Sequence, residues 1–214
     1  MTPWFWYRHN IHNLGAAMNS ILLIKSSLNG EQSHSNTLSQ SLVKQLNVKG
    51  NVTIVRRDLA KDNLPHLTQA EMGAWMTDIA QRSQEQTDLA TISDDLIEEL
   101  KNSDTIVVAM PMYNFGVPST FKAWVDRVAR AGITFQYTEN GPAGLLKDKT
   151  VIVVASRGGI YAGTQKDSQT QYLKDVFSFM GMEDITFIYA EGLNMLGSDE
   201  RLAQAQQTIN EFTR

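Results

Sequence analysis

The sequence contains no cysteine, which excludes disulfide bonds, thiol nucleophiles and thiolate metal sites. It also has no excess of positive charge, and its net charge of −4 argues against nucleic acid or an anionic membrane as a general partner. No apolar stretch approaches the roughly 20 residues that a membrane-spanning helix needs. The 214 residues do have 42% hydrophobic and 20% charged side chains, the composition of one ordinary globular domain.

Several signatures of catalytic sites are also missing. There is no Gly-x-Gly-x-x-Gly dinucleotide fingerprint, and Gly158 and Gly163 have the spacing of a P-loop without its Lys-Ser/Thr ending. No Gly-x-Ser-x-Gly elbow occurs. The histidines form no ligand-spaced pair, so we expect no metal site; they are His9, His12, His34 and His66. With no evident acid, base or nucleophile, we expect the chemistry to come from a bound cofactor.

Residues 1–17 differ from the rest of the chain. They show neither helical nor strand periodicity, and they lack the apolar core of a signal peptide. We predict that they form a disordered extension and that residues 18–214 form a single domain. The alternative is an aromatic arm that docks on a partner or on a membrane surface.

Five short apolar runs rich in isoleucine and valine predict five strands. Most runs are continuous rather than alternating, which is typical of strands buried on both faces of a parallel sheet. Helical apolar patterns separate the runs, as in repeated strand–helix–strand units. We therefore predict an α/β fold, with a doubly wound sheet of five parallel strands in the order 2-1-3-4-5 and helices on both faces. The runs are residues 21–24, 52–55, 106–110, 151–155 and 185–189.

Residues 60–90 form an extra segment between the second and third predicted strands. Met72, Trp75, Met76 and Ile79 recur in it at helical spacing. These side chains either form a small core of their own or line a dimer interface or substrate pocket. Exposed methionine and tryptophan would favour the second interpretation.

Three loops that follow predicted strands have the composition of ligand sites. In residues 25–35, Ser33 and Ser35 are placed to cap the next helix, whose free amides and dipole suit a phosphate monoester. In residues 111–118, two aromatics, an amide and a thioether suit a flat aromatic ring with polar edges. The glycine pair in residues 156–160 would let a ligand approach the backbone closely. Plain helix capping in the first loop and a tight turn in the third are the alternatives.

The chain carries, in this order, the motifs Lys25-Ser-Ser27, Ser33-His-Ser-Asn36, Pro111-Met-Tyr-Asn-Phe115, Val128-Ala-Arg-Ala-Gly132, Thr134-Phe-Gln-Tyr-Thr-Glu-Asn-Gly-Pro142 and Ser156-Arg-Gly-Gly-Ile160. In their order and spacing, these motifs resemble the bacterial FMN-dependent NADH:quinone oxidoreductase/azoreductase family. The resemblance covers residues 18–214 and implies a flavodoxin-like fold, a homodimer and one FMN per subunit. The chain departs from the family at His34, where glutamine is frequent. A histidine could act through its backbone, so we expect FMN binding to persist.

The resemblance implies an FMN site at the three loops. It places the phosphate at Ser27, Ser33, His34 and Ser35, the isoalloxazine against Met112, Tyr113, Asn114 and Phe115, and the other edge of the ring under Ser156, Arg157, Gly158 and Gly159. Phe135, Tyr137 and Phe179 are candidates for the substrate cavity, where they could stack on a flat acceptor, with core packing as the alternative. No side chain is expected to be catalytic, because the reaction takes place on the flavin.

The activity implied by the resemblance is a two-step, ping-pong reaction with NADH or NADPH as the reductant. Bound FMN is reduced first, and it then gives two electrons to a quinone or reductively cleaves an aromatic azo compound to amines. Such an enzyme would be cytoplasmic and would contribute to resistance to electrophilic quinones. One alternative is a flavodoxin-like electron carrier without a small-molecule substrate of its own, and another is a flavin-free domain of the same fold. Carriers usually have a compact Thr-Gly-rich loop and strongly acidic charge, which this chain lacks.

Overall fold

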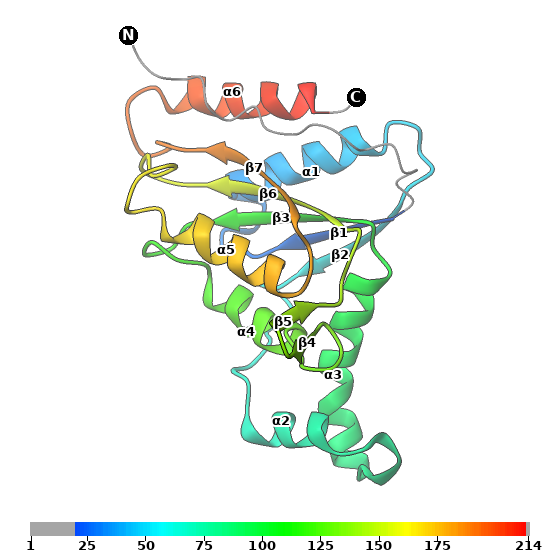
Figure 1. The fold of residues 1–214 in the computed structure, drawn as a ribbon. Helices are drawn as coiled ribbons and strands as arrows, with labels where there is room; N and C mark the ends of the chain where they lie inside the picture. Colours follow the sequence, from blue (N-terminus) through cyan, green and yellow to red (C-terminus); the bar gives the residue numbers. More distant parts are fainter. Residues whose placement is uncertain (1–19, 213–214) are drawn as a thin grey trace.

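The structure of the protein is a computed structural model that describes residues 20–212. The extension predicted at residues 1–17 lies outside the described residues. A central sheet has the strand order β2-β1-β3-β6-β7, with every neighbouring pair parallel (Figure 1). Its strands are β1 (Ser20–Lys25), β2 (Thr53–Asp58), β3 (Thr105–Pro111), β6 (Thr150–Ser156) and β7 (Asp184–Ala190). Counted along the chain, this is the order 2-1-3-4-5, so the predicted doubly wound sheet is confirmed.

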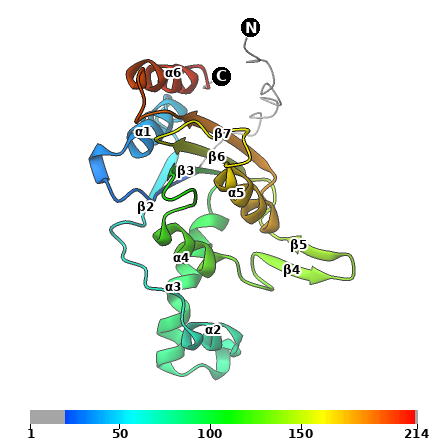
Figure 2. The ribbon, with the colours of Figure 1, turned by 90° about the vertical axis from the view of Figure 1, so that its left-hand side faces the viewer.

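Helices cover both faces of the sheet, as the alternation of strand and helix patterns predicts (Figures 1 and 2). One face carries α1 (His34–Leu46) and α6 (Ser198–Glu211). The other face carries α3 (Gln84–Lys101), α4 (Ser119–Val128) and α5 (Ser168–Phe179). Within residues 20–212, none of the helices combines the length and the apolar character needed to cross a membrane.

The central strands supply side chains to two separate cores. All seven residues of β3 are buried. Ile106 and Val108 belong to the cluster beneath α3, α4 and α5, whereas Val107 belongs to the cluster beneath α1 and α6. Because successive side chains of a strand point to opposite faces, a strand covered on both sides is apolar throughout. The continuous apolar runs in the sequence have this origin.

The segment between β2 and β3 forms a lobe that extends beyond the sheet (Figure 1). It contains α2 (Gln69–Met76), the short 3-10 helix η2 (Ile79–Gln81) and the first turns of α3. Met72, Met76 and Ile79 are exposed on this lobe. Trp75 is half-buried, with the guanidinium of Arg130 5.2 Å from its ring centroid. The exposure of the other three favours a surface that meets a partner or a ligand, whereas Trp75 packs within the protein.

A buried ion pair fastens the lobe to α4. Nε of Arg127 donates to Oε1 of Glu71 at 3.0 Å, and Nη2 of Arg127 donates to Oε2 at 3.0 Å. Nη1 of Arg127 donates to the carbonyl oxygens of Pro65 and Ala123. The Arg127 side chain is fully buried and that of Glu71 is 3% exposed, so the two charges compensate each other away from water.

The chain also forms a small antiparallel hairpin that its apolar periodicity did not predict. It consists of β4 (Phe135–Thr138) and β5 (Gly141–Gly144), and it projects from the side of the molecule (Figure 2). The hairpin returns close to the end of α5, where a Cβ on Gly144 would lie 2.0 Å from the backbone nitrogen of Gly181. Only a glycine allows this approach of two backbones.

Candidate functional site

The three candidate loops come together at one edge of the sheet. They follow β1, β3 and β6, and the carboxyl ends of parallel strands meet at the same edge. The phenol oxygen of Tyr113, after β3, lies 3.3 Å from Oγ of Ser27 and accepts a 3.1 Å hydrogen bond from the amide of Leu28, both after β1. The amide of Met112 donates to the carbonyl oxygen of Ser156, the last residue of β6. The loop after β3 therefore joins the other two.

The serine loop (residues 25–35) surrounds the beginning of α1 with buried hydroxyls. Ser33 is the N-cap and accepts a hydrogen bond from the amide of Asn36, as predicted. Ser35 does not cap the helix; its Oγ lies 3.1 Å from Oγ of Ser33. Ser27, Ser33 and Ser35 are each at most 4% exposed. Buried hydroxyls around a helix N-terminus make a neutral but strongly donating environment, which suits an anion.

A buried acceptor lies at the same place. Nδ2 of Asn36 donates to the carbonyl oxygen of Gly30, while Oδ1 of Asn36 is buried with no hydrogen-bond partner among the described residues. This side chain therefore closes the serine loop and retains one free acceptor.

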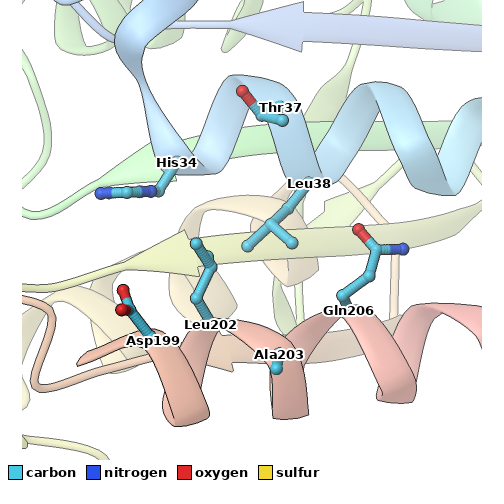
Figure 3. A pocket seen from close by; sticks show the side chains of 7 residues that line it. All are labelled: His34, Thr37, Leu38, Asp199, Leu202, Ala203 and Gln206. Atoms are coloured by element: carbon cyan, nitrogen blue, oxygen red, sulfur yellow. The ribbon is translucent and has the colours of Figure 1, made fainter. Parts of the chain in front are cut away.

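His34 contributes its backbone to the helix start but turns its ring elsewhere. The side chain is exposed and borders a groove of about 380 Å³ between α1 and α6 (Figure 3). The groove is otherwise lined by Thr37, Leu38, Asp199, Leu202, Ala203 and Gln206. Apart from His34, none of the sequence-predicted site residues lines it, so the groove and the three loops are separate features.

The Tyr113 turn (residues 113–116) has an unusual backbone. Tyr113 and Gly116 exchange hydrogen bonds, Tyr113 amide to Gly116 carbonyl at 3.1 Å and the reverse at 2.9 Å. Between them, Asn114 and Phe115 have φ values of 50° and 65°, both left-handed, as in a type I′ turn. Such turns favour Asn-Gly, and a side chain in this conformation costs about 1–2 kcal/mol. Phe115 is half-exposed, and its ring meets that of Tyr161 edge-on at 5.5 Å.

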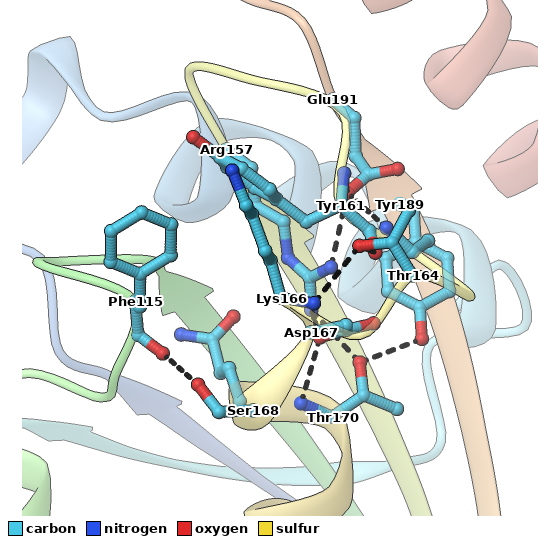
Figure 4. A network of polar contacts seen from close by, with 12 residues as sticks. Phe115, Arg157, Tyr161, Thr164, Lys166, Asp167, Ser168, Thr170, Tyr189 and Glu191 are labelled. Atoms are coloured by element: carbon cyan, nitrogen blue, oxygen red, sulfur yellow. Dashed lines mark hydrogen bonds and ion pairs between the residues drawn. The ribbon is translucent and has the colours of Figure 1, made fainter.

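Arg157 turns its side chain into the protein rather than toward the other loops (Figure 4). The guanidinium is fully buried, donating to Oε1 of Glu191 at 3.0 Å and to Oγ1 of Thr170 at 2.9 Å. It also forms an ion pair with Asp167 at 2.9 Å and lies 4.9 Å from the ring centroid of Tyr189. Arg157 could therefore contact a ligand at the three loops only through its backbone.

The carboxylates around Arg157 organise the loop after β6 (residues 157–167). Oε1 of Glu191 accepts hydrogen bonds of 2.9 Å from the amides of Tyr161 and Ala162. Burial alone would raise the pKa of Asp167, but hydrogen bonds from Arg157 and Thr170 outweigh it and hold that pKa below its usual value. Asp167 also caps α5 by accepting from the Thr170 amide. Sequence reasoning missed both carboxylates, although an aspartate directly before a helical pattern is a recognisable N-cap signal.

The two glycines of this loop are packed against protein side chains. A Cβ on Gly158 would lie 2.5 Å from Nδ2 of Asn194, and one on Gly159 would lie 2.7 Å from the ring of Tyr161. Side-chain packing therefore accounts for both glycines, and the close approach of a ligand to them stays a prediction.

The three aromatic candidates for a substrate cavity form a cluster at the other end of α5. Phe135 is buried and lies 4.2 Å, centroid to centroid, from Phe179, while the exposed Tyr137 meets Phe135 edge-on at 5.6 Å. Phe179 is the last residue of α5, whereas Ser168, its first, contacts the Tyr113 turn. At roughly 1.5 Å per residue, these ends of the helix are about 16 Å apart. One chain therefore does not bring this cluster to the three loops.

Within residues 20–212, no cluster of histidine, aspartate and glutamate side chains is arranged to hold a metal ion.

Comparison with known proteins adds independent findings. A family model described as having a flavodoxin-like fold matches residues 19–213. An FMN-dependent NADH:quinone oxidoreductase of Alteromonas mediterranea is 50% identical over 200 residues, covering 92% of this chain and 100% of the relative. A protein of the same name from Pseudoalteromonas atlantica is 51% identical over 196 residues, covering 92% and 96%. The FMN-dependent NADH-azoreductase of Bacillus anthracis, solved in complex with FMN, has a TM-score of 0.83 at 27% identity and covers 91% of this chain and 97% of that one.

Proposed function

We propose that this chain, which belongs to the flavodoxin-like family of FMN-dependent NADH:quinone oxidoreductases, reduces quinones and aromatic azo compounds with NADH or NADPH. When bound at the three loops, FMN would supply the redox chemistry, which is hydride acceptance from the nicotinamide and delivery of two electrons to the acceptor. The observation that supports this proposal most directly is the bond between Tyr113 and Ser27. It joins a hydroxyl-lined helix start and an aromatic turn, the two surfaces that a phosphorylated flat ring requires.

The serine loop fits the phosphate of FMN. The first amides of α1, including those of His34 and Ser35, have no acceptor within the helix and can donate to phosphate oxygens. The hydroxyls of Ser27, Ser33 and Ser35 add donors without adding charge. In this arrangement His34 acts through its backbone, since its ring borders the groove against α6.

The other two loops fit the ring. Met112, Tyr113, Asn114 and Phe115 would hold one side of the isoalloxazine, and the backbone of residues 156–159 would donate hydrogen bonds to its far edge. Negative charge grows at the N1–C2 edge on reduction, so fixed amide donors there favour the reduced state. The guanidinium of Arg157 would not touch the ring, because it is fully buried and its two terminal nitrogens are held by Glu191, Asp167 and Thr170.

A homodimer would complete the substrate site. Phe135, Tyr137 and Phe179 lie a helix length from the Tyr113 turn of their own chain, so they would line its cavity only from a second copy. The exposed Tyr137 and the exposed apolar side chains of the lobe are suited to such an interface. We place the enzyme in the cytoplasm, where two-electron reduction would protect against electrophilic quinones without releasing radicals.

Purified protein with NADH and a benzoquinone, without any partner protein, tests the proposal. We expect a yellow protein that releases FMN on denaturation and oxidises NADH stoichiometrically with quinone reduction. A yellow protein that needs a partner to transfer electrons would instead be a carrier, and a colourless protein that does not take up FMN would be a flavin-free domain. The Asn114→Ala variant should retain the fold and lose flavin occupancy or turnover.

A further inference from the structure

Gln169 spans the two ends of the loop that carries the Tyr113 turn. It is the second residue of α5 and only 1% exposed. Its Nε2 donates to the carbonyl oxygen of Pro111 at 2.9 Å and to that of Gly116 at 3.0 Å. Pro111 is the last residue of β3, and Gly116 closes the turn. Because both neighbours are acceptors, only the NH₂ end of the amide can face them, which fixes its orientation.

Ser168 adds a third bond of the same kind. Its Oγ donates to the carbonyl oxygen of Phe115 at 2.6 Å (Figure 4). The two adjacent side chains are held at this place because Asp167 caps α5 and is itself paired with Arg157. The start of α5 thus makes hydrogen bonds to three carbonyl groups of one loop, those of Gln169 from a buried side chain and that of Ser168 at the surface.

The Tyr113 turn needs contacts with the rest of the chain to keep its conformation. Asn114 and Phe115 are both left-handed, and a bulky residue in that conformation persists only where its surroundings determine it. The mutual bonds of Tyr113 and Gly116 form an isolated bridge, with no ladder beyond it to fix the turn. Packing of the Phe115 ring against Tyr161 is partly open to solvent. The turn is therefore tied to the rest of the chain at two places, by the Tyr113 hydroxyl to Ser27 and Leu28 and by the donor of Gln169, a residue only 1% exposed, to Gly116. Gln169 alone also reaches the other end of the loop, at Pro111.

We propose that Gln169 is a positioning residue that holds the Tyr113 turn in its flavin-binding conformation before FMN arrives, with Ser168 as an auxiliary anchor. The inference rests on the proposed function for its ligand, but the hold itself is a property of the FMN-free chain. A ligand that binds one conformation of a turn has an apparent dissociation constant inversely proportional to the fraction of molecules in it. Preorganisation by Gln169 would therefore appear as FMN affinity, although the side chain need not touch FMN.

Two substitutions at Gln169 and their matched controls test the proposal. Gln169→Met keeps the volume and removes both donors. Gln169→Glu replaces the donors by a carboxylate facing two carbonyl oxygens. Gln171, two residues further along α5, is exposed, and its side chain donates only to Asp175 among residues 20–212. Gln171→Met and Gln171→Glu therefore carry the same changes without touching the loop.

We expect amide exchange at residues 113–116 of FMN-free Gln169→Met to be faster than in wild type, with the strand amides of Val107 and Val153 unchanged. FMN should bind about 10- to 100-fold more weakly, while Gln171→Met behaves like wild type. For Gln169→Glu, the loss of FMN affinity relative to wild type should become smaller as the pH falls from 8.5 to 5. The protonated carboxyl group regains one donor, and the buried site facing two carbonyl oxygens raises the pKa of that group. The FMN phosphate titrates near pH 6, so each affinity is compared with wild type at the same pH.

The inference would be overturned if folded Gln169→Met showed the amide exchange of wild type at residues 113–116, or bound FMN as tightly as wild type. It would also be overturned if the loss of FMN affinity in Gln169→Glu did not change with pH. If Gln169→Met does not fold, Ser168→Ala decides, with faster exchange and several-fold weaker FMN binding supporting the inference and unchanged values refuting it. Wild-type protein that binds no FMN would refute the proposed function alone, since the exchange measurement needs no ligand.

Discussion

The hydroxyl of Tyr113 lies 3.3 Å from that of Ser27, joining residues that are 86 positions apart in the sequence. The same phenol oxygen accepts from the amide of Leu28, so one side chain fixes both the serine loop and the Tyr113 turn. We expect Tyr113→Phe to weaken FMN binding about fivefold, the equivalent of one hydrogen bond worth about 1 kcal/mol. Fluorescence titration of the FMN-free protein measures this. Tyr172→Phe, which removes a phenol oxygen that has no partner among the described residues, should leave the affinity unchanged. Equal affinities in all three proteins would contradict the role of this bond.

Ser35 should recognise the phosphate specifically. Its side chain is fully buried beside Ser33 at the start of α1. We expect Ser35→Ala to weaken FMN binding by about 3- to 30-fold, since a hydrogen bond to a charged group contributes more than a neutral one. Riboflavin, which lacks the phosphate, should bind wild type and variant equally. Ser39→Ala, one turn further along α1, is the control because the Ser39 hydroxyl donates to the Asn36 carbonyl instead. An equal loss for FMN and riboflavin would assign Ser35 to the fold rather than to the phosphate.

The ion pair between Arg127 and Glu71 should be critical for the lobe. Glu71→Ala leaves a fully buried guanidinium without its counter-charge, which costs about 3–5 kcal/mol. Urea unfolding monitored by circular dichroism measures the loss of unfolding free energy. Asp126→Ala on α4 breaks the exposed pair with Lys122 and should cost less than about 1 kcal/mol. Similar losses in both variants would show that burial does not set the contribution of the pair.

Two glycines should respond oppositely to the same substitution. A Cβ at Gly144 meets the backbone of Gly181, which cannot move aside as a side chain can. Gly144→Ala should therefore destabilise the protein by several kcal/mol, on the order of a severe overpacking. Gly73→Ala, in α2, meets no atom of the described residues within 4 Å and should stabilise by about 0.5–1 kcal/mol. Thermal unfolding of the two variants gives the signs, and a stabilised Gly144→Ala would contradict the backbone contact.

The sheet could be predicted from the sequence because a strand that is buried on both faces has a continuous run of apolar residues. Val107 and Val108 serve opposite cores, so neither position can be polar, and the run is apolar without interruption. The hairpin has no such run, since Phe135 is the one buried residue of β4. The turn signal Asn140-Gly141 was present in the sequence and would have indicated it.

The residues of the candidate site also differ in whether the sequence could predict their roles. Ser33 could be predicted as a cap because capping is local in sequence. Gln169 and Glu191 could not, because their bonds to Pro111 and Arg157 cross 58 and 34 residues. Nothing about a glutamine in an amphipathic helix shows which loop it will meet. The resemblance placed Arg157 beside the ligand, and this stays a prediction for its backbone, since its side chain pairs with Glu191 and Asp167.

Asp167 should make the stability of the protein sensitive to acid. Its pKa is lowered in the folded state, so its ionised form stabilises the fold above the ordinary value near pH 4, and this contribution is lost as the pH falls through the folded pKa. Asp167→Asn should therefore be less stable than wild type at pH 7, by on the order of 1–3 kcal/mol for its bonds to Arg157. The difference should narrow steadily below about pH 4. Chemical denaturation between pH 7 and pH 2.5 measures it, with the exposed Asp175→Asn as the control. A difference between Asp167→Asn and wild type that persists unchanged at low pH would show that Asp167 contributes through packing rather than through its charge.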